Sequence, residues 1–128
     1  MKAYFISATS LVGAGAVQLC GGYDKLFSIL LVVVVLDYLT GILKAIYTKT
    51  LNSTIGFKGL IKKVMMFTIV ALAVALDKLY NTAFLRDGVI FAFIINESIS
   101  ILENTGEVIP IPPIIKQFLD KLKDGRQK

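Results

Sequence analysis

Residues 26–47 read LFSILLVVVVLDYLTGILKAIY, and this stretch decides the fold class. It includes the unbroken aliphatic run LLVVVVL at residues 30–36. A helix needs about 20 predominantly apolar residues to cross a bilayer, and this stretch is long enough. Its β-branched residues would also suit a buried strand, but an open strand cannot satisfy its backbone hydrogen bonds in lipid. We therefore expect a membrane-spanning helix here.

The composition of the whole chain agrees with that expectation. Of 128 residues, 55% are hydrophobic and 18% are charged, and the mean hydropathy is +0.73. Soluble domains are about 45–50% apolar and about 25% charged. The hydrophobicity excludes a disordered chain, and the single cysteine, Cys20, excludes a disulfide scaffold. The length allows one domain.

Three further stretches are apolar enough, or nearly so, to cross a membrane. The sequence predicts an all-α integral membrane protein: one membrane domain over residues 1–128, with a bundle of four transmembrane helices at about 3–20, 26–47, 60–80 and 84–103. The first stretch also has the features of a secretory signal, with an A-x-A site at 14–16, so a bundle of three helices is the alternative. In the tail, residues 104–128, apolar side chains at 114, 115, 118, 119 and 122 predict a short amphipathic helix at about 114–124.

Basic residues predict the orientation of these helices. They are concentrated between the second and third stretches and in the tail, whereas the other two turns carry one and two. The positive-inside rule places Lys-rich segments in the cytoplasm, so we expect both termini there. The lysines expected at the membrane surface are Lys49, Lys58, Lys62, Lys63, Lys116, Lys121 and Lys123.

Polar side chains inside the predicted spans are the candidate functional residues. A charge at the bilayer centre costs at least about 2.5–3.5 kcal/mol, so such residues are rare unless they have a role. On the second helix they lie on one face at spacings of three, four and seven, and on the fourth helix they again lie near one face. Packing of these two faces would pair acid with base, either as structural contacts within one bundle or as a polar surface that becomes wet in an assembly. The residues are Asp37, Thr40, Gly41, Lys44, Asn96, Glu97, Ser100 and Asn104.

Small residues predict close helix packing at two places. Gly13 lies in a glycine- and alanine-rich part of the first helix, and Ala71 and Ala75 have the small-x-x-x-small spacing that lets helices approach closely. Between the second and third helices, Ser53 or Thr54 is expected to cap a helix, and the glycines at 56 and 59 to form a turn.

No catalytic or metal-binding constellation is visible in the sequence. The chain has no histidine and one cysteine, so neither a Cys–His pair nor a typical zinc site can be built. The segments outside the predicted spans are too short to enclose an active-site pocket. We expect no enzyme activity, no metal and no cofactor, and the basic residues punctuate apolar runs rather than forming a nucleic-acid-binding face.

The polar residues fall within an ordered set of motifs. Residues 37–45 fit D-x-L-x-G-x-x-x-A, and residues 52–63 fit N-S-x-x-G-x-x-G-x-x-K-K. Asp77 follows, then E-S-x-S-I-L-x-N at 97–104 and I-P-x-P at 109–112. In this order the motifs resemble those of the toxin secretion/phage lysis holin family over about two thirds of the chain, residues 37–122. The first helix lies outside the match.

This resemblance implies a function. Holins of that family are phage-encoded proteins of the bacterial cytoplasmic membrane that form homo-oligomers and open lesions. The lesions release an endolysin without requiring contact with it, or export a large toxin, and an antiholin is a candidate partner. The alternatives from other classes are a small four-helix transporter or proton-coupled exporter using Glu97, and a structural subunit without a pore.

Overall fold

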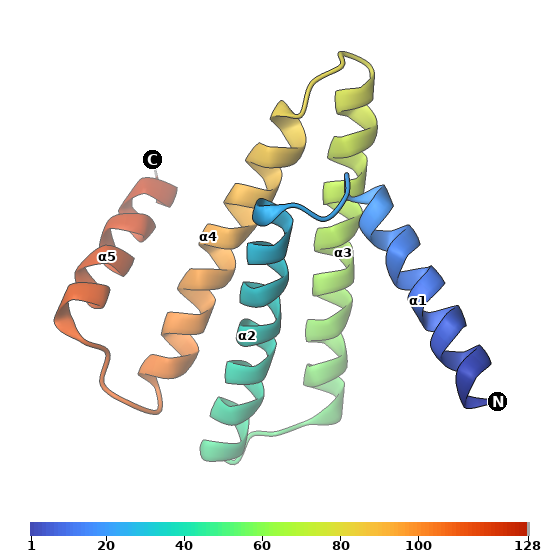
Figure 1. Cartoon of the computed structure of the whole chain (residues 1–128). Helices are drawn as coiled ribbons and strands as arrows, with labels where there is room; N and C mark the ends of the chain where they lie inside the picture. The colour runs from blue at the N-terminus through green and yellow to red at the C-terminus, as the bar shows by residue number, and fades with distance from the viewer. Residues whose placement is uncertain (128) are drawn as a thin grey trace.

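The computed structural model describes residues 1–127, which form five α-helices joined by short connections (Figure 1). They are α1 (Lys2–Leu19), α2 (Lys25–Tyr47), α3 (Ser53–Lys78), α4 (Phe84–Gly106) and α5 (Pro113–Gln127). This confirms the predicted all-α class.

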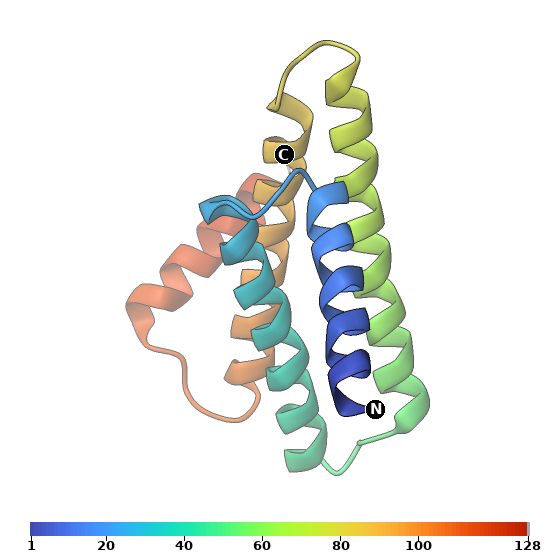
Figure 2. The ribbon, with the colours of Figure 1, turned by 45° about the vertical axis from the view of Figure 1, so that its right-hand side comes forward.

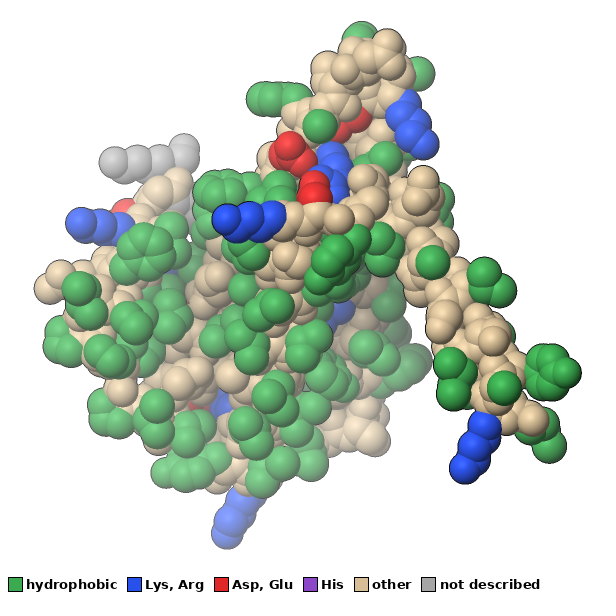
Figure 3. Space-filling model, in the orientation of Figure 1, with side chains coloured by type: hydrophobic (Ala, Val, Ile, Leu, Met, Phe, Trp, Pro, Cys, Tyr) green, Lys and Arg blue, Asp and Glu red, His purple; other side chains and the backbone are tan. Residues whose placement is uncertain are grey.

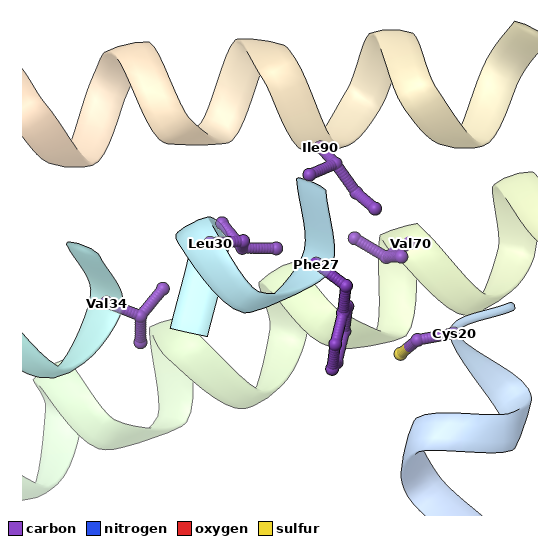
Figure 4. Close-up of a cluster of buried hydrophobic side chains, with 6 residues drawn as sticks. All are labelled: Cys20, Phe27, Leu30, Val34, Val70 and Ile90. Carbon is purple, nitrogen blue, oxygen red and sulfur yellow. The ribbon is translucent and has the colours of Figure 1, made fainter. Parts of the chain in front are cut away.

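Helices α2, α3 and α4 form the body of the molecule, with neighbours in sequence running in opposite directions (Figure 1). Helix α4 packs closely against both α2 and α3, whereas α2 and α3 contact each other much less. The hydrophobic core is a cluster contributed by these three helices and the connection after α1 (Figure 4). Its buried members are Cys20, Phe27, Leu30, Val34, Val70 and Ile90.

Side-chain caps fix where α2 and α3 begin. The Asp24 carboxylate accepts a hydrogen bond from the Phe27 N–H at 2.9 Å, and the Asn52 side chain accepts one from the Thr54 N–H at 2.8 Å. Each cap satisfies a backbone donor that has no partner within its helix. The cap of α3 is therefore Asn52 rather than Ser53 or Thr54.

The start of α3 differs from the sequence prediction. The helix begins seven residues before 60, and Gly56 and Gly59 lie inside it rather than in a turn. Both glycines face Tyr38 of α2, whose hydroxyl donates to the Gly56 carbonyl at 3.4 Å. The helix continues through the glycines because a capped start and long-range packing outweigh their low helix propensity.

Two of the helices, α2 and α3, are long and apolar enough to cross a membrane by length and composition. Helices α1 and α4 do not meet the same test in the part of the chain that the structure describes. Helix α4 falls short because Arg86, Asp87, Glu97 and Glu103 all lie within it. Four spans therefore remain a prediction.

Large apolar side chains cover the outer faces of α2, α3 and α4. Val32 is 56% exposed, Leu72 53% and Phe91 58%. Figure 3 shows apolar side chains spread over most of the visible face. Apolar surface of this extent favours contact with lipid or with another protein over contact with water.

The small residues predicted to mediate packing are not central to it within this chain. On α3 the buried face contains Val70, Ala73 and Val74, while Ala71 is half-buried and Ala75 is exposed. Gly13 has open space around it.

The two outer helices differ in how they contact the body. Helix α1 has no buried residue, and Figure 1 shows it diverging from α3 towards its N-terminus. Helix α5 is amphipathic, as predicted, and extends beyond the predicted residues at both ends. It packs on α4, buries Leu119, and joins it through an ion pair of 2.9 Å between Lys123 and Glu103.

Candidate functional site

Three charged side chains from three different helices meet between α2, α3 and α4. The Lys63 ammonium donates to the Asp37 carboxylate at 2.6 Å and to the Glu97 carboxylate at 2.7 Å. The side chains of Lys63, Asp37 and Glu97 are 12%, 13% and 6% exposed. We call these three residues the charge triad.

The position of Lys63 corrects the sequence prediction in one respect. The polar faces of α2 and α4 do pack together, but the base between their acids is Lys63 of α3, which was expected at the membrane surface. Lys44 pairs with Glu107 at 3.3 Å instead, and both of those side chains are partly exposed to solvent.

Amide and hydroxyl groups extend the triad along the α2–α4 contact. The Asn104 amide donates to the Asp37 carboxylate and to the Thr40 hydroxyl, both at 3.2 Å. Gly41 lies against Asn104: a Cβ there would be 3.6 Å from its amide nitrogen. Of the eight predicted intramembrane residues, Asp37, Thr40, Gly41, Glu97 and Asn104 are thus brought together directly.

A cavity of about 720 Å³ lies beside the triad. Its walls include the remaining predicted residues Asn96 and Ser100, and it extends to Thr50 and Asn52 in the α2–α3 connection. Lys44 and Lys62 also line it, so the cavity has more lysines than carboxylates on its walls. This is a polar space at the end of the molecule that carries the Lys-rich connection.

The charges of the triad do not balance. One lysine faces two carboxylates, so when all three are ionised the net charge is one negative. Removing an ion from water costs several kcal/mol even after the protein relaxes, and attraction offsets this only with good geometry and additional hydrogen bonds. Lys63 can bond both acids because an ammonium has three N–H donors. The arrangement therefore depends on that one side chain.

The helical period contains a signal that identifies Lys63. The buried residues Val70, Ala73 and Asp77 of α3 recur at a spacing of three to four, and Lys63 lies seven residues before Val70 on the same face. Its neighbour Lys62 lies off that face and is exposed. The helical period places these two adjacent lysines on different faces of α3, whereas a count of basic residues treats them alike.

The other predicted surface lysines remain outside the triad. Lys49, Lys58, Lys116 and Lys121 are exposed, and Lys123 is half-buried in its pair with Glu103.

A second cluster of buried charge lies near the other end of the bundle, and the sequence patterns did not predict it. All five N–H donors of the Arg86 guanidinium are used: they reach the carbonyls of Cys20 and Gly22, both oxygens of Asp24, and Asp87, at 2.7–3.2 Å. We call Arg86 with these partners the Arg86 clasp. It ties the α1–α2 connection to the first turn of α4. Figure 3 shows acidic and basic side chains gathered near this end.

Asp77 completes the start of α4 from a neighbouring helix. Its carboxylate accepts from the Leu85 N–H at 3.0 Å, the Arg86 N–H at 2.8 Å and the Thr82 hydroxyl at 2.9 Å. Helix α4 begins after Ala83, which has no side chain that can cap it, so Asp77 supplies the cap. Only the resemblance had singled out Asp77, and no local pattern connects it with Arg86.

The Arg86 guanidinium also affects the ionisation of its exposed partner. Its hydrogen bonds to Asp24, together with that from the Phe27 N–H, hold the pKa of the Asp24 carboxyl below its usual range. The Asp24 side chain is 52% exposed, so solvent weakens this interaction.

Neither charge cluster has the composition of a metal site. Within residues 1–127 no group of three or more His, Cys, Asp or Glu side chains could hold a metal ion. The triad has two carboxylates already bonded to an ammonium, and Cys20 is buried in the hydrophobic core. The arrangement holds charged side chains away from water. It contains no nucleophile beside a base that could activate it.

Comparison with known proteins identifies similar chains. Residues 14–124 match the Bacteriophage holin family. The chain is 40% identical over 109 residues to an uncharacterized 14.9 kDa protein in the nagH 3′ region of Clostridium perfringens, over 83% of each chain. It is 36% identical over 135 residues to an uncharacterized protein of Halalkalibacterium halodurans, over 100% of each. It is 31% identical over 110 residues to a probable holin of Bacillus phage phi105, over 84% of this chain and 82% of that one. No solved structure matches it.

Proposed function

Because this chain belongs to the bacteriophage holin family, we propose that it forms homo-oligomers in the bacterial cytoplasmic membrane and opens lesions wide enough for a folded protein. The family consists of non-enzymatic membrane proteins, and the chain is accordingly not an enzyme. The protein released is an endolysin, or a large toxin, and its escape leads to lysis or secretion.

The proposed topology has four spans with both termini in the cytoplasm. Helices α2 and α3 meet the requirements for spanning, and the lysines of their connection favour its cytoplasmic side. Helix α4 is proposed to span despite its charges, because Arg86 and Glu97 are buried against other helices rather than facing lipid. Helix α1 is the least polar of the remaining helices, with one charged residue, Lys2, at its end.

The observation that carries the mechanism is the buried charge triad. Two carboxylates and one lysine lie away from water beside a polar cavity. If several chains rearrange so that the polar faces of α2 and α4 line a lumen, each of these charges becomes hydrated and its burial cost disappears. In the closed chain Lys63 bonds both carboxylates and offsets part of their charge, whereas in an open assembly water would hydrate all three side chains.

A neutral triad tests this mechanism. In the triple variant Asp37→Asn, Lys63→Met, Glu97→Gln the charges are removed while side-chain size is nearly kept. We expect this protein to accumulate in the membrane and to release a folded cytoplasmic reporter enzyme at least tenfold more slowly than the unaltered chain. The matched control is Lys58→Met, which removes an exposed lysine of the same helix that does not line the cavity and leaves release unchanged.

The same assay separates the alternative functions. A dye and a folded enzyme are followed together in cells that express only this protein. Release of both supports the lesion. Release of the dye alone would indicate a transporter or small channel, and release of neither would indicate a structural subunit. Release by the neutral variant at the normal rate would overturn the role of the triad.

A further inference from the structure

Helix α1 and the α2–α3 groove are two apolar surfaces without partners in this conformation. Along α1, Tyr4 is 80% exposed, Phe5 72% and Leu11 75%. Between α2 and α3 lies a groove of about 410 Å³, lined by Val34, Val35 and Tyr38 from α2 and by Leu60, Val64 and Phe67 from α3. The apolar side chains that line the groove are exposed: Val35 is 62% exposed and Val64 59%.

The end of α1 already touches one end of this groove. The thiol of Cys20, directly after α1, lies 3.8 Å from the carbonyl oxygen of Phe67, a groove residue. Val17, one turn earlier, packs against the hydrophobic core to which Cys20 belongs. The groove continues from Phe67 to Val64 and Leu60, in the direction in which α1 extends from Cys20 back to its N-terminus. In the turned view, α1 projects over the space between α2 and α3 (Figure 2).

We call residues 20–22, at the C-terminal end of α1, its root. The root is held in place, whereas the direction of α1 is not. The Arg86 clasp holds the carbonyls of Cys20 and Gly22, so the connection stays beside α4. Gly21 and Gly22 have φ angles of +91° and +94°, a backbone region that favours glycine, and a Cβ on Gly21 would lie 2.5 Å from the Arg86 Nε. N-terminal to Val17, every residue of α1 is exposed.

We propose that α1 is an arm that docks lengthwise into the α2–α3 groove of its own chain. The structure represents the undocked position, and the docked position is reached by rotation at the root. When docked, α1 covers the apolar walls of α2 and α3; when undocked, it leaves them open to other chains. The arm thus regulates which surfaces an assembly can use, and the inference holds whether or not the assembly opens lesions.

The register of docking follows from the contact at the root. Helices α1 and α3 run in the same direction, and each rises 1.5 Å per residue. Because Cys20 lies opposite Phe67, counting back the same number of residues along both helices gives the other facing pairs. Val17 then lies opposite Val64 and Gly13 opposite Leu60. Cys20, Val17 and Gly13 recur at spacings of three and four, which places them on one face of α1. A glycine opposite a leucine permits the close approach that the groove requires.

The hydroxyls of Ser7 and Thr9 in α1 do not oppose docking. The Ser7 and Thr9 hydroxyls each donate to carbonyls one turn earlier in their own helix, at 2.9 Å. They keep these hydrogen bonds when they enter an apolar environment, so burial leaves neither of these two hydroxyl donors unpaired.

Disulfide trapping in the full-length protein tests the inference. The variant Gly13→Cys, Leu60→Cys, in a Cys20→Ala background, is oxidised in native membranes, and its disulfides are read from mobility on non-reducing gels. Neither new position is buried, since a Cβ added at Gly13 would have no atom within 4 Å and Leu60 is 48% exposed. The control replaces Gly15, which also has open space and lies on the opposite side of α1 from Gly13, and keeps Leu60→Cys.

A disulfide forms only when the Cα atoms approach to about 4.4–6.8 Å. We expect an intrachain disulfide at least fivefold more abundant with Gly13→Cys than with Gly15→Cys. A disulfide-linked dimer instead would overturn the inference, because α1 would then dock on a second copy. Equal yields from the two pairs, or no disulfide from either, would overturn it as well, because α1 would then be covered by lipid.

Discussion

The Arg86 clasp and the charge triad are both buried clusters of charge, but their partners differ in kind. Arg86 bonds two backbone carbonyls as well as carboxylates, and the adjacent Asp77 bonds backbone N–H groups. Backbone groups in a connection or at a helix start cannot leave without unfolding that segment. The charge triad contains side chains only, from three helices, beside a cavity.

This difference indicates different roles for the two clusters. A cluster bonded to backbone is suited to hold one geometry, and here it fixes the connections at one end of the bundle. Side chains that bond only each other can exchange those bonds for water if their helices separate, without breaking any helix. The clasp is thus expected to govern stability, and the triad the transition to an open assembly.

The largest expected effect is loss of the clasp. Arg86→Met leaves the Cys20 and Gly22 carbonyls without their donor, at about 1–3 kcal/mol for each buried group left unpaired, and also removes the half-exposed ion pair with Asp24. Thermal unfolding in detergent and the level of protein in membranes measure this. Arg86→Lys is the control: it keeps the charge but not the planar fork, so it should recover only part of the stability. Unchanged stability of Arg86→Met would show that the clasp does not hold the fold.

Loss of the central lysine of the triad is next. Lys63→Met leaves Asp37 and Glu97 facing each other, which costs about 3 kcal/mol and favours the hydrated arrangement. We expect release of a folded reporter to begin earlier at equal protein levels. Lys58→Met, which removes an exposed lysine outside the cavity, should behave as the unaltered chain does. Release by Lys63→Met on the normal schedule would contradict the role of the triad in keeping the assembly closed.

Asp77→Ala should have an intermediate effect confined to stability. It removes a cap from α4 and leaves the Leu85 and Arg86 N–H groups unpaired, at a cost of about 1–3 kcal/mol. Hydrogen exchange of the first turn of α4 measures this locally. Thr82→Ala, which removes one of the groups bonded to Asp77, is a milder control. Equal exchange in Asp77→Ala and the unaltered chain would exclude the cap.

Acid should weaken the clasp slightly. Because its pKa is lowered in the folded chain, ionised Asp24 stabilises the fold above its unfolded pKa of about 3.9, and this contribution is lost as pH falls through the lower folded value. Since Asp24 is about half exposed, the loss should stay below about 1 kcal/mol. Unfolding temperatures between pH 6 and pH 3 measure it. The Asp24→Asn variant should lack this part of the pH dependence. If the variant still shows it, another titrating group is responsible.

The smallest effect is expected at the exposed pair of Lys44 and Glu107. Its two side chains are 34% and 53% exposed, and such pairs contribute about 0–1 kcal/mol. Lys44→Met should therefore leave both unfolding temperature and release nearly unchanged. A large change in release with unchanged stability would move Lys44 into the functional site.

The sequence predicts the helices well because their signals are local. Unbroken apolar runs mark α2, and polar residues at helical spacing mark the faces of α2 and α4 that pack together. Its errors come from long-range packing. Gly56 and Gly59 have the composition of a turn, but their place in a helix depends on Tyr38, which is distant in sequence.

The candidate site was predicted in part for the same reason. The sequence indicates both acids of the triad, because charges in apolar helices are costly wherever they pack. Lys63 resembles its neighbour Lys62 by composition, and only the helical period distinguishes their faces. The clasp joins residues 62 positions apart, Asp24 and Arg86, and no pattern within either segment indicates the pairing.

The most direct test asks whether the polar face around the triad becomes wet when lesions open. Ser100→Cys, in a Cys20→Ala background, places a thiol of nearly equal size on the wall of the polar cavity. Phe91→Cys places one on the opposite side of α4, where the side chain is 58% exposed on the apolar surface. A maleimide attached to a polymer of roughly 5 kDa is too large for a cavity of about 720 Å³ but not for a lesion that passes folded protein.

The reagent is added to inverted membrane vesicles prepared before and after the onset of lysis, so that the cytoplasmic side is accessible in both. We predict that Ser100→Cys is modified only after onset and Phe91→Cys at neither time. Protection of Ser100→Cys in membranes that already release folded protein would contradict the claim that this face lines the opening.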